Sequence, residues 1–482
     1  MRTFRNKLQG GSSPIRLLTA AMIWQDRAIT GASSMASMDS VGSPEARLRA
    51  ELDGLPLTRL HVLLLLGCCI ALAFDLAEIS FGNILSAIFS APPHSASSWE
   101  LGLLISSVYI GAAVGAPLMG WIGDAYGRRT ALIIAMLWLS IVSFCAAVSF
   151  NNAMLVASRL AAGLSLGAYP PLMFALLTDI LPPRRRGALI VTATAIGYVG
   201  PTAFIFFVRF LSSSPPFGID AWRWGFLLAG LGAALSAAAF WCLPESPRWL
   251  IAKGHLARAA GVIGAFKKSE RLLPSDVGML PAGEKANARP AERSLLGEAA
   301  FLLTIYFLSP WPTVGFTLLS GAVLIAKGMN VQDSLLYVGI STFGPILGTL
   351  GGGLFVDRFE RKTFLVVTAL GMGLVGLIFG ASEVPIMLVG TALIFNVLFA
   401  LFLPMLVLYA AEITSTVNRA KLTSWAWTAN RVGSALVPLV LLPILHSWGP
   451  IAMFALISAS TVLFVVIVSC FGPRGAAGRN LR

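Results

Sequence analysis

Long apolar runs separated by short polar segments make up most of this chain. A run of about 18–25 apolar residues is long enough to cross the hydrocarbon core of a bilayer as a helix. Because lipid offers the backbone no hydrogen bonds, such runs must be helical. The pattern therefore predicts an all-α membrane protein with twelve transmembrane helices, over residues 61–89, 100–122, 130–150, 153–180, 188–210, 223–243, 298–325, 334–355, 363–381, 386–411, 423–445 and 450–471.

Polar segments divide these spans into two sets of six. The charged stretch 245–296 is a predicted linker between an N-terminal half, 59–244, and a C-terminal half, 297–472. Residues 1–58 are polar and contain no run long enough to span, so we expect a mostly disordered N-terminal segment. Residues 473–482 are a predicted short tail.

The loops differ in their content of lysine and arginine, which sets the orientation. One set of loops contains Arg128, Arg129, Arg184, Arg185, Arg186, Arg358, Arg361, Lys362, Arg419, Lys421 and the basic residues of 245–296. The opposite loops contain only Arg209, Arg223 and Lys327. The positive-inside rule predicts a multi-pass protein of the cell (inner) membrane, with both termini and the linker in the cytoplasm.

Composition agrees with this pattern and excludes several functions. The chain is 56% hydrophobic and 12% charged, whereas about a quarter of the residues of a typical soluble domain are charged. The net charge of +13 lies in short loops beside apolar spans, so topology explains it and no nucleic-acid partner is expected. The five cysteines and four histidines lack metal-site spacing. We expect no metal, no cofactor and, without a nucleophile–base set, no enzyme.

The two halves contain the same charged motifs at a constant offset. Gly120, Asp124 and Arg128 follow the second span, and Gly353, Asp357 and Arg361 follow the eighth, each 233 positions later. Asp179 and Arg186 after the fourth span match Glu412 and Arg419 after the tenth, again 233 positions later. A repeat at fixed offset indicates that the halves arose by duplication.

These motifs resemble those of known transporters. The loop G-x-x-x-D-x-x-G-R-R at 120–129 is similar to the signature of the major facilitator superfamily, and Pro244–Leu250 resembles a motif that sugar porters have after the sixth span. The resemblance covers about 60–472. It implies two six-helix halves related by a pseudo-two-fold axis along the membrane normal. It also implies that a small-molecule substrate crosses the membrane by alternating access. The protein is expected to function as a monomer in the lipid bilayer.

The resemblance further implies a conformational latch at the cytoplasmic side. Carboxylates near helix ends can join neighbouring helices through arginines by charge-assisted hydrogen bonds. The expected latch closes the cytoplasmic side in the outward-facing state; the alternative is that these charges serve topology alone. The candidate latch residues are Gly120, Asp124, Gly127, Arg128, Arg129, Asp179, Arg186, Glu245, Arg248, Gly353, Asp357, Arg361, Lys362, Glu412 and Arg419.

Ionisable residues inside the spans indicate the coupling chemistry, because they are costly in lipid. Asp75 and Glu78 lie three residues apart, on one face of the first span, and Arg159 lies in the fourth. By resemblance to proton-coupled sugar porters, Asp75 pairs with Arg159 and carries the proton. The alternative is a static salt bridge. Glu78 is either a second carrier or a residue that sets the environment of Asp75.

Arg431 lies deep in the eleventh span and requires an acid of the first span or an anionic substrate as its partner. Its surroundings resemble the Arg-x-Gly pattern of aromatic-acid symporters, and Tyr306 and Trp311 belong to a similar aromatic-Trp-Pro segment in span seven. An aromatic stripe that only packs is an equal alternative. Further substrate candidates are Tyr109, Tyr198, Asn396 and Asn430, although such residues commonly bond between helices.

The chain also departs from both patterns. It lacks the Gln pair of sugar porters in span seven and their Pro-Glu-Thr motif after span twelve. The Asp-Gly-x-Asp of aromatic-acid symporters is reduced to Asp75 followed by Glu78. We therefore expect a metabolite:proton symporter for a small organic acid, aromatic acids included. The alternatives are a sugar or polyol:proton symporter, a proton-driven efflux antiporter, or a membrane sensor without flux.

Overall fold

The computed structural model describes residues 43–183, 185–270, 295–355, 359–414 and 419–473, which are helical between short turns and contain no strand. The N-terminal half comprises α3 (Arg59–Ser90), α4 (Ser98–Tyr126), α5 (Arg128–Ala147), α6 (Asn152–Leu166), α7 (Tyr169–Ile180), α8 (Arg186–Gly197), α9 (Val199–Ser212) and α10 (Ala221–Cys242). The C-terminal half comprises α13 (Leu295–Leu308), α14 (Pro310–Ala326), α15 (Val331–Ser341), α16 (Phe343–Phe355), α17 (Arg361–Ala381), α18 (Pro385–Ile413) and α19 (Arg419–Phe471).

The described helices confirm the twelve predicted spans. Eleven helical segments are long and apolar enough to cross a membrane. The last segment contains two crossings, because Gly449 has a φ of 80° and breaks α19 between residues 445 and 450. Four spans are two helices in series: α6 with α7, α8 with α9, α13 with α14, and α15 with α16. In the seventh span the division falls at Ser309, immediately before Pro310, a residue that interrupts the hydrogen bonding of a helix.

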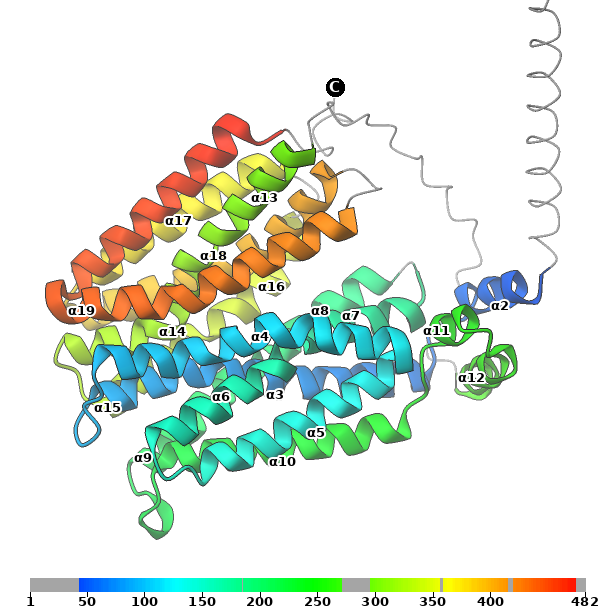
Figure 1. The fold of residues 1–482 in the computed structure, drawn as a ribbon, viewed down its shortest axis with the longest axis horizontal. Coiled ribbons are helices and arrows are strands. Elements are labelled where there is room, and N and C mark those ends of the chain that lie inside the picture. Colours follow the sequence, from blue (N-terminus) through cyan, green and yellow to red (C-terminus); the bar gives the residue numbers. More distant parts are fainter. Residues whose placement is uncertain (1–42, 184, 271–294, 356–358, 415–418, 474–482) are drawn as a thin grey trace, which may run out of the picture.

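The two halves approach each other at one end and diverge toward the other (Figure 1). Helices α2 (Pro44–Asp53), α11 (Pro247–Ala252) and α12 (Leu256–Lys268) lie at the divergent end. We call this end the linker end and the opposite end the far end. Hydrogen bonds between the halves come from the far-end parts of their spans: Arg209 Nε donates to Gln332 O at 3.1 Å, and Thr202 Oγ1 donates to Thr342 O at 3.2 Å.

Glycines allow α4 and α6 to pack with their backbones in contact. A Cβ on Gly111 would collide with the carbonyl of Leu160, and one on Gly115 would collide with the backbone of Leu164. Small residues at helix interfaces permit this close approach in membranes. The contact fixes the depth at which α6, and with it Arg159, enters the N-terminal half.

Helix α2 was not predicted: residues 44–53, within the segment expected to be mostly disordered, form a helix. Ser43 Oγ accepts from Ala46 N at 3.2 Å and caps the helix, with Pro44 at its first position. Asp53 forms an ion pair with Arg248 of α11 at 2.5 Å, and Glu51 forms one with Lys267 of α12. A short polar helix is stabilised mainly by packing against other elements. The partners of α2 lie about 200 residues later in the chain, so its local sequence did not indicate them. Residues 1–42, 271–294 and 474–482 lie outside the described part.

The linker also returns to the start of the first span. The backbone N–H of Arg59 donates to Glu270 O at 2.9 Å, and the N–H of Leu60 donates to Ser269 Oγ at 3.1 Å. The first N–H groups of a helix have no partner within the helix. The two residues that follow α12 therefore supply acceptors for the first two N–H groups of α3.

Candidate functional site

Two buried carboxylates lie near the middle of α3 on nearly the same face. Asp75 and Glu78 are 0% and 1% exposed, respectively. Glu78 Oε1 accepts from Arg159 Nη1 at 3.0 Å and from Ser143 Oγ at 3.3 Å. Arg159 Nη2 also donates to the backbone carbonyl of Glu78 at 3.0 Å. The guanidinium carbon lies 5.6 Å from the ring centroid of Phe226, a cation–π distance.

The predicted pairing of Asp75 with Arg159 is therefore wrong in this structure. Glu78 is the partner because it lies three residues, or about 4.5 Å, further toward the far end than Asp75. Arg159 belongs to α6, which begins at the far end with Asn152, and its guanidinium meets α3 at the depth of Glu78.

Asp75 is left without a hydrogen bond to either carboxylate oxygen among the described residues. The charges that act on it are those of Arg431, which belongs to the other half, and of Glu78. The phenol of Tyr109 on α4 lies within the electrostatic field of both Arg431 and Arg159. Glu78 and Arg159 thus form a hydrogen-bonded ion pair, whereas Asp75 and Arg431 interact across the two halves by charge alone.

In the C-terminal half, Arg431 lies beside an aromatic residue of its own helix. Its guanidinium carbon lies 5.8 Å from the ring centroid of Trp427, one turn earlier on α19. The ring of Tyr306 meets that of Trp427 edge-on, with centroids 5.5 Å apart. Asn430 Nδ2 donates to Ser309 Oγ at 3.0 Å, at the division between α13 and α14. This group therefore connects α19 to the break in the seventh span.

The other predicted substrate residues are distributed unevenly. Trp311 is partly buried, and its indole N–H has no partner within the described chain. Tyr198 is partly buried at the junction of α8 and α9. Asn396 is buried and donates to Ala392 O of its own helix at 3.0 Å, so it satisfies a local carbonyl. The structure brings together Tyr306, Asn430 and Arg431.

Three residues of the site were missed by sequence reasoning. Ser143 supports Glu78, Ser309 receives Asn430, and Trp427 lies beneath Arg431. Trp427 had a usable signal, because residues four positions apart on a helix are neighbours. The two serines had none, since their contacts join different helices.

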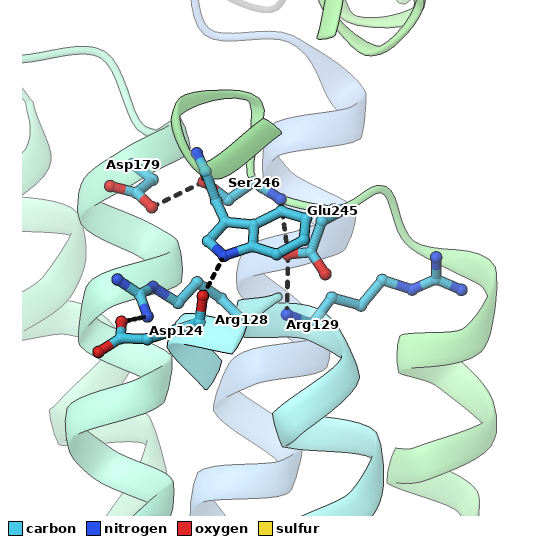
Figure 2. Close-up of polar contacts among 7 residues, drawn as sticks. Asp124, Arg128, Arg129, Asp179, Glu245 and Ser246 are labelled. Carbon is cyan, nitrogen blue, oxygen red and sulfur yellow. Dashed lines mark hydrogen bonds and ion pairs between the residues drawn. The ribbon is translucent and has the colours of Figure 1, made fainter. Parts of the chain in front are cut away.

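At the linker end, Glu245 caps the start of α5 (Figure 2). Its carboxylate accepts from the backbone N–H of Arg129 at 2.9 Å and of Thr130 at 3.4 Å. Gly127 has a φ of +110°, and a Cβ there would collide with this carboxylate, so the turn requires glycine. Arg128 forms an ion pair with Asp124 across the turn. The motif thus places an anion at a helix N-terminus.

The segment after the sixth span connects several helices of the N-terminal half. Ser246 Oγ donates to Asp179 Oδ2 at 2.7 Å (Figure 2), and Arg248 Nε donates to Asp179 O at 3.2 Å. Trp249 Nε1 donates to Asp124 O at 3.0 Å. These contacts tie α4, α7 and α11 together.

The matching cluster of the C-terminal half is simpler. Arg361 Nε forms an ion pair with Glu412 Oε1 at 3.2 Å, and Lys362 Nζ donates to Ser469 O at 2.9 Å. Gly353 lies within α16, and Arg419 is the first residue of α19. Asp357 and the side chain of Arg419 lie outside the described residues. In the N-terminal half, Arg186 is the first residue of α8. The contacts given above for the two clusters stay within one half each, so a latch between the halves remains a prediction.

Replacing Glu245 by Ala is expected to destabilise the protein by about 0.5–2 kcal/mol, the usual cost of a lost N-cap. The backbone N–H groups of Arg129 and Thr130 would lose their acceptor. Thermal unfolding of the detergent-purified protein measures the loss. Glu298→Ala is the control, because Glu298 lies in the first turn of α13 in the other half. Equal stability of Glu245→Ala and the wild type would contradict the capping role.

Comparison with known proteins agrees with this architecture. A family model described as "Sugar (and other) transporter" matches residues 62–478. The putative metabolite transport protein YyaJ of Bacillus subtilis is 26% identical over 89% of this chain and 96% of its own length. The D-xylose transporter of Levilactobacillus brevis is 25% identical over 71% of this chain and 79% of its own.

A solved structure shares the fold. The inward-open xylose transporter XylE of Escherichia coli matches with a TM-score of 0.67 and 21% identity, over 86% of this chain and 96% of that one. The fold is that of the major facilitator superfamily, with two halves of six spans. The relatives are transporters and not enzymes. This chain belongs to the sugar (and other) transporter family of multi-pass membrane transporters.

Proposed function

We propose that this transporter moves a small organic acid together with a proton by alternating access. The observation that carries this proposal is Arg431, a cation deep in a membrane span that no hydrogen bond or ion pair joins to a carboxylate among the described residues. Intramembrane cations mark ligand or ion pathways. The planar fork of arginine suits a carboxylate through two parallel hydrogen bonds.

Asp75 is the proposed proton carrier. Its carboxylate is buried, has no hydrogen-bond donor in the described structure, and interacts with the charge of Arg431. A substrate carboxylate on Arg431 competes with Asp75 for the same positive charge, so substrate binding favours proton uptake by Asp75. By linkage, a proton on Asp75 favours the substrate on Arg431 to the same extent. One anion and one proton then move together.

Glu78 has a different proposed role. Its pair with Arg159 is closed by two direct contacts and supported by Ser143. Breaking a buried pair leaves an uncompensated charge. We therefore assign the pair to holding α3 against α6, which keeps Asp75 at a fixed depth.

The basic loops support a cytoplasmic linker end and cytoplasmic termini. The halves diverge toward that end (Figure 1), which supports an inward-facing assignment of this state. The name of one relative, the inner membrane metabolite transport protein YgcS of Escherichia coli, supports the inner membrane as the location.

A sugar or polyol:proton symporter is the second candidate. The family model and the D-xylose transporter among the relatives favour it. In that case hydroxyl groups of the substrate would donate to the unpartnered oxygens of Asp75, and Arg431 would serve the charge of Asp75 alone.

The two candidates are distinguished by the substrates that cause proton movement and by the effect of replacing Arg431 by Gln. In proteoliposomes containing a pH-sensitive dye, benzoate-type and hydroxy acids are expected to cause proton movement, whereas xylose, glucose and inositol are not. Loss of a charge-assisted contact, about 1.5–3 kcal/mol, should raise KM for the acid by about 10- to 150-fold. Arg431→Lys should lose less. Arg223→Gln is the control, because Arg223 binds loop carbonyls at the far end. A wild-type response to sugars and none to acids would replace the organic-acid proposal.

A further inference from the structure

The side chain of Asn83 makes an unusual contact between the two halves. Asn83 lies on α3, eight residues beyond Asp75, and is 4% exposed. Its Nδ2 donates to Thr317 O at 2.7 Å and to Ser320 Oγ at 2.9 Å. Its Oδ1 accepts from Gly321 N at 2.8 Å. The carboxamide therefore uses both its donor and its acceptor on α14 of the opposite half.

The two backbone groups that it binds are a matched pair. In an α-helix the N–H of one residue bonds to the carbonyl four positions earlier, and Gly321 follows Thr317 by four. Both groups belong to the continuous helix α14, so Asn83 adds its bonds to a donor and an acceptor that stand at the spacing of one helical hydrogen bond. Ser86 adds a weaker contact of the same kind, because its Oγ lies 3.3 Å from Ala322 N.

Glycine makes this contact possible. A Cβ on Gly321 would lie 2.7 Å from Asn83 Oδ1 and 2.8 Å from Asn83 O, closer than real Cβ atoms approach. A Cβ on Gly82 would lie 3.1 Å from the side chain of Leu318. Helices α3 and α14 are therefore seated so closely that a side-chain amide reaches the backbone.

The contact is also reversible at small cost. If the halves separate at the far end, Gly321 N and Thr317 O remain part of the backbone ladder of α14, and the Asn83 amide can bond to water. No buried group is then orphaned, which would otherwise cost free energy. A contact between halves that must open in every cycle needs this property. An unsatisfied buried pair would make opening too costly.

Helix α14 connects the residues that Asn83 binds to the candidate site. This helix begins one residue after Ser309, which receives Asn430, the neighbour of Arg431. Thr317 lies eight residues beyond Ser309, or about 12 Å along the helix axis. The candidate site and the residues that Asn83 binds are therefore joined by two turns of a single helix.

We propose that Asn83, with Thr317, Ser320 and Gly321, forms a clasp that closes the far end of the transport path. Asn83 is a positioning residue: it sets the balance between the closed and open far end and does not contact the substrate. This inference rests on the proposed alternating access, and its test requires no substrate.

The test measures access to a reporter cysteine at Thr202, a residue 5% exposed that faces the other half through its bond to Thr342. Cys145, Cys242 and Cys470, which are exposed, are first replaced by Ser. A membrane-impermeant maleimide is applied separately to each side of oriented vesicles. Asn83→Ala is expected to raise the labelling rate from the far side by roughly 5- to 30-fold, the factor that one or two lost hydrogen bonds produce.

Two further variants decide the outcome. Gly321→Ala keeps Asn83 but forces the helices apart, so it should also raise far-side labelling. Thr368→Ala removes a buried polar side chain that bonds within its own helix, α17, and should leave labelling unchanged. If Asn83→Ala fails to fold, the far-side labelling rates of Gly321→Ala and Ser320→Ala test the proposal instead. Unchanged labelling in the folded clasp variants overturns the clasp, whereas absence of any proton response to acids or sugars contradicts the transport proposal alone.

Discussion

Replacing Asp75 by Asn is expected to abolish accumulation driven by a pH gradient while leaving exchange of substrate across the membrane intact. Asn has nearly the same shape but cannot bind and release a proton in the working pH range. A gradient of one pH unit corresponds to about 1.4 kcal/mol per proton and sustains about tenfold accumulation of a co-transported anion. In the variant the ratio of inside to outside substrate should fall to about one, because no proton then moves with the substrate.

The measurement is uptake into proteoliposomes of an acid that causes proton movement with the wild type. Exchange of labelled for unlabelled acid without a gradient shows whether the variant still moves substrate. Glu78→Gln is the matched control on the same helix. It keeps a hydrogen-bonding group beside Ser143 and Arg159 and should retain accumulation in whatever fraction folds. Tenfold accumulation by Asp75→Asn would show that another group carries the proton.

Replacing Arg159 by Met is expected to destabilise the protein by about 3–5 kcal/mol. Arg159 and Glu78 are each about 1% exposed and 3.0 Å apart. Removal of the arginine would leave the Glu78 carboxylate buried with only Ser143 as a side-chain donor. Such a loss is a large fraction of the stability of a typical folded protein, so a sharp fall in the yield of monodisperse protein should accompany it. Thermal unfolding in detergent gives the size of the effect.

Two comparisons separate this effect from a general loss of packing. Glu78→Gln combined with Arg159→Met removes both charges and should recover most of the stability, because no buried ion is left unpaired. Arg128→Met breaks the ion pair with Asp124, whose side chain is 71% exposed, and should cost at most about 1 kcal/mol. If Arg159→Met unfolds at the wild-type temperature, Glu78 is not an uncompensated anion in this site.

The spans could be predicted well because lipid imposes a simple rule on them. An apolar run of sufficient length has to be a helix, and all twelve runs are. The repeat at a constant offset predicted where charged residues recur. The cluster in each half contains an ion pair: Arg128 with Asp124 in the N-terminal half, and Arg361 with Glu412 in the C-terminal half. These pairs form over short distances between adjacent helices of one half.

The partner of Arg159 could not be predicted in the same way. Spacing along α3 places Asp75 and Glu78 on one face, but the choice between them depends on the relative depth of α3 and α6. That depth is set in part by the contact of Gly111 and Gly115 with α6, which is a property of two packed helices. Asn83 was missed for a related reason, since its partners are backbone groups of α14, and any sequence offers those.

The return of the linker to Arg59 has a consequence for the order of synthesis. The first turn of α3 finds its acceptors at Ser269 and Glu270, beyond the sixth span, which ends at Cys242. On the ribosome, the earliest membrane helix is therefore inserted long before its own first turn can be completed. The unit that matures first during translation extends past the last span of the N-terminal half and ends with the linker helices.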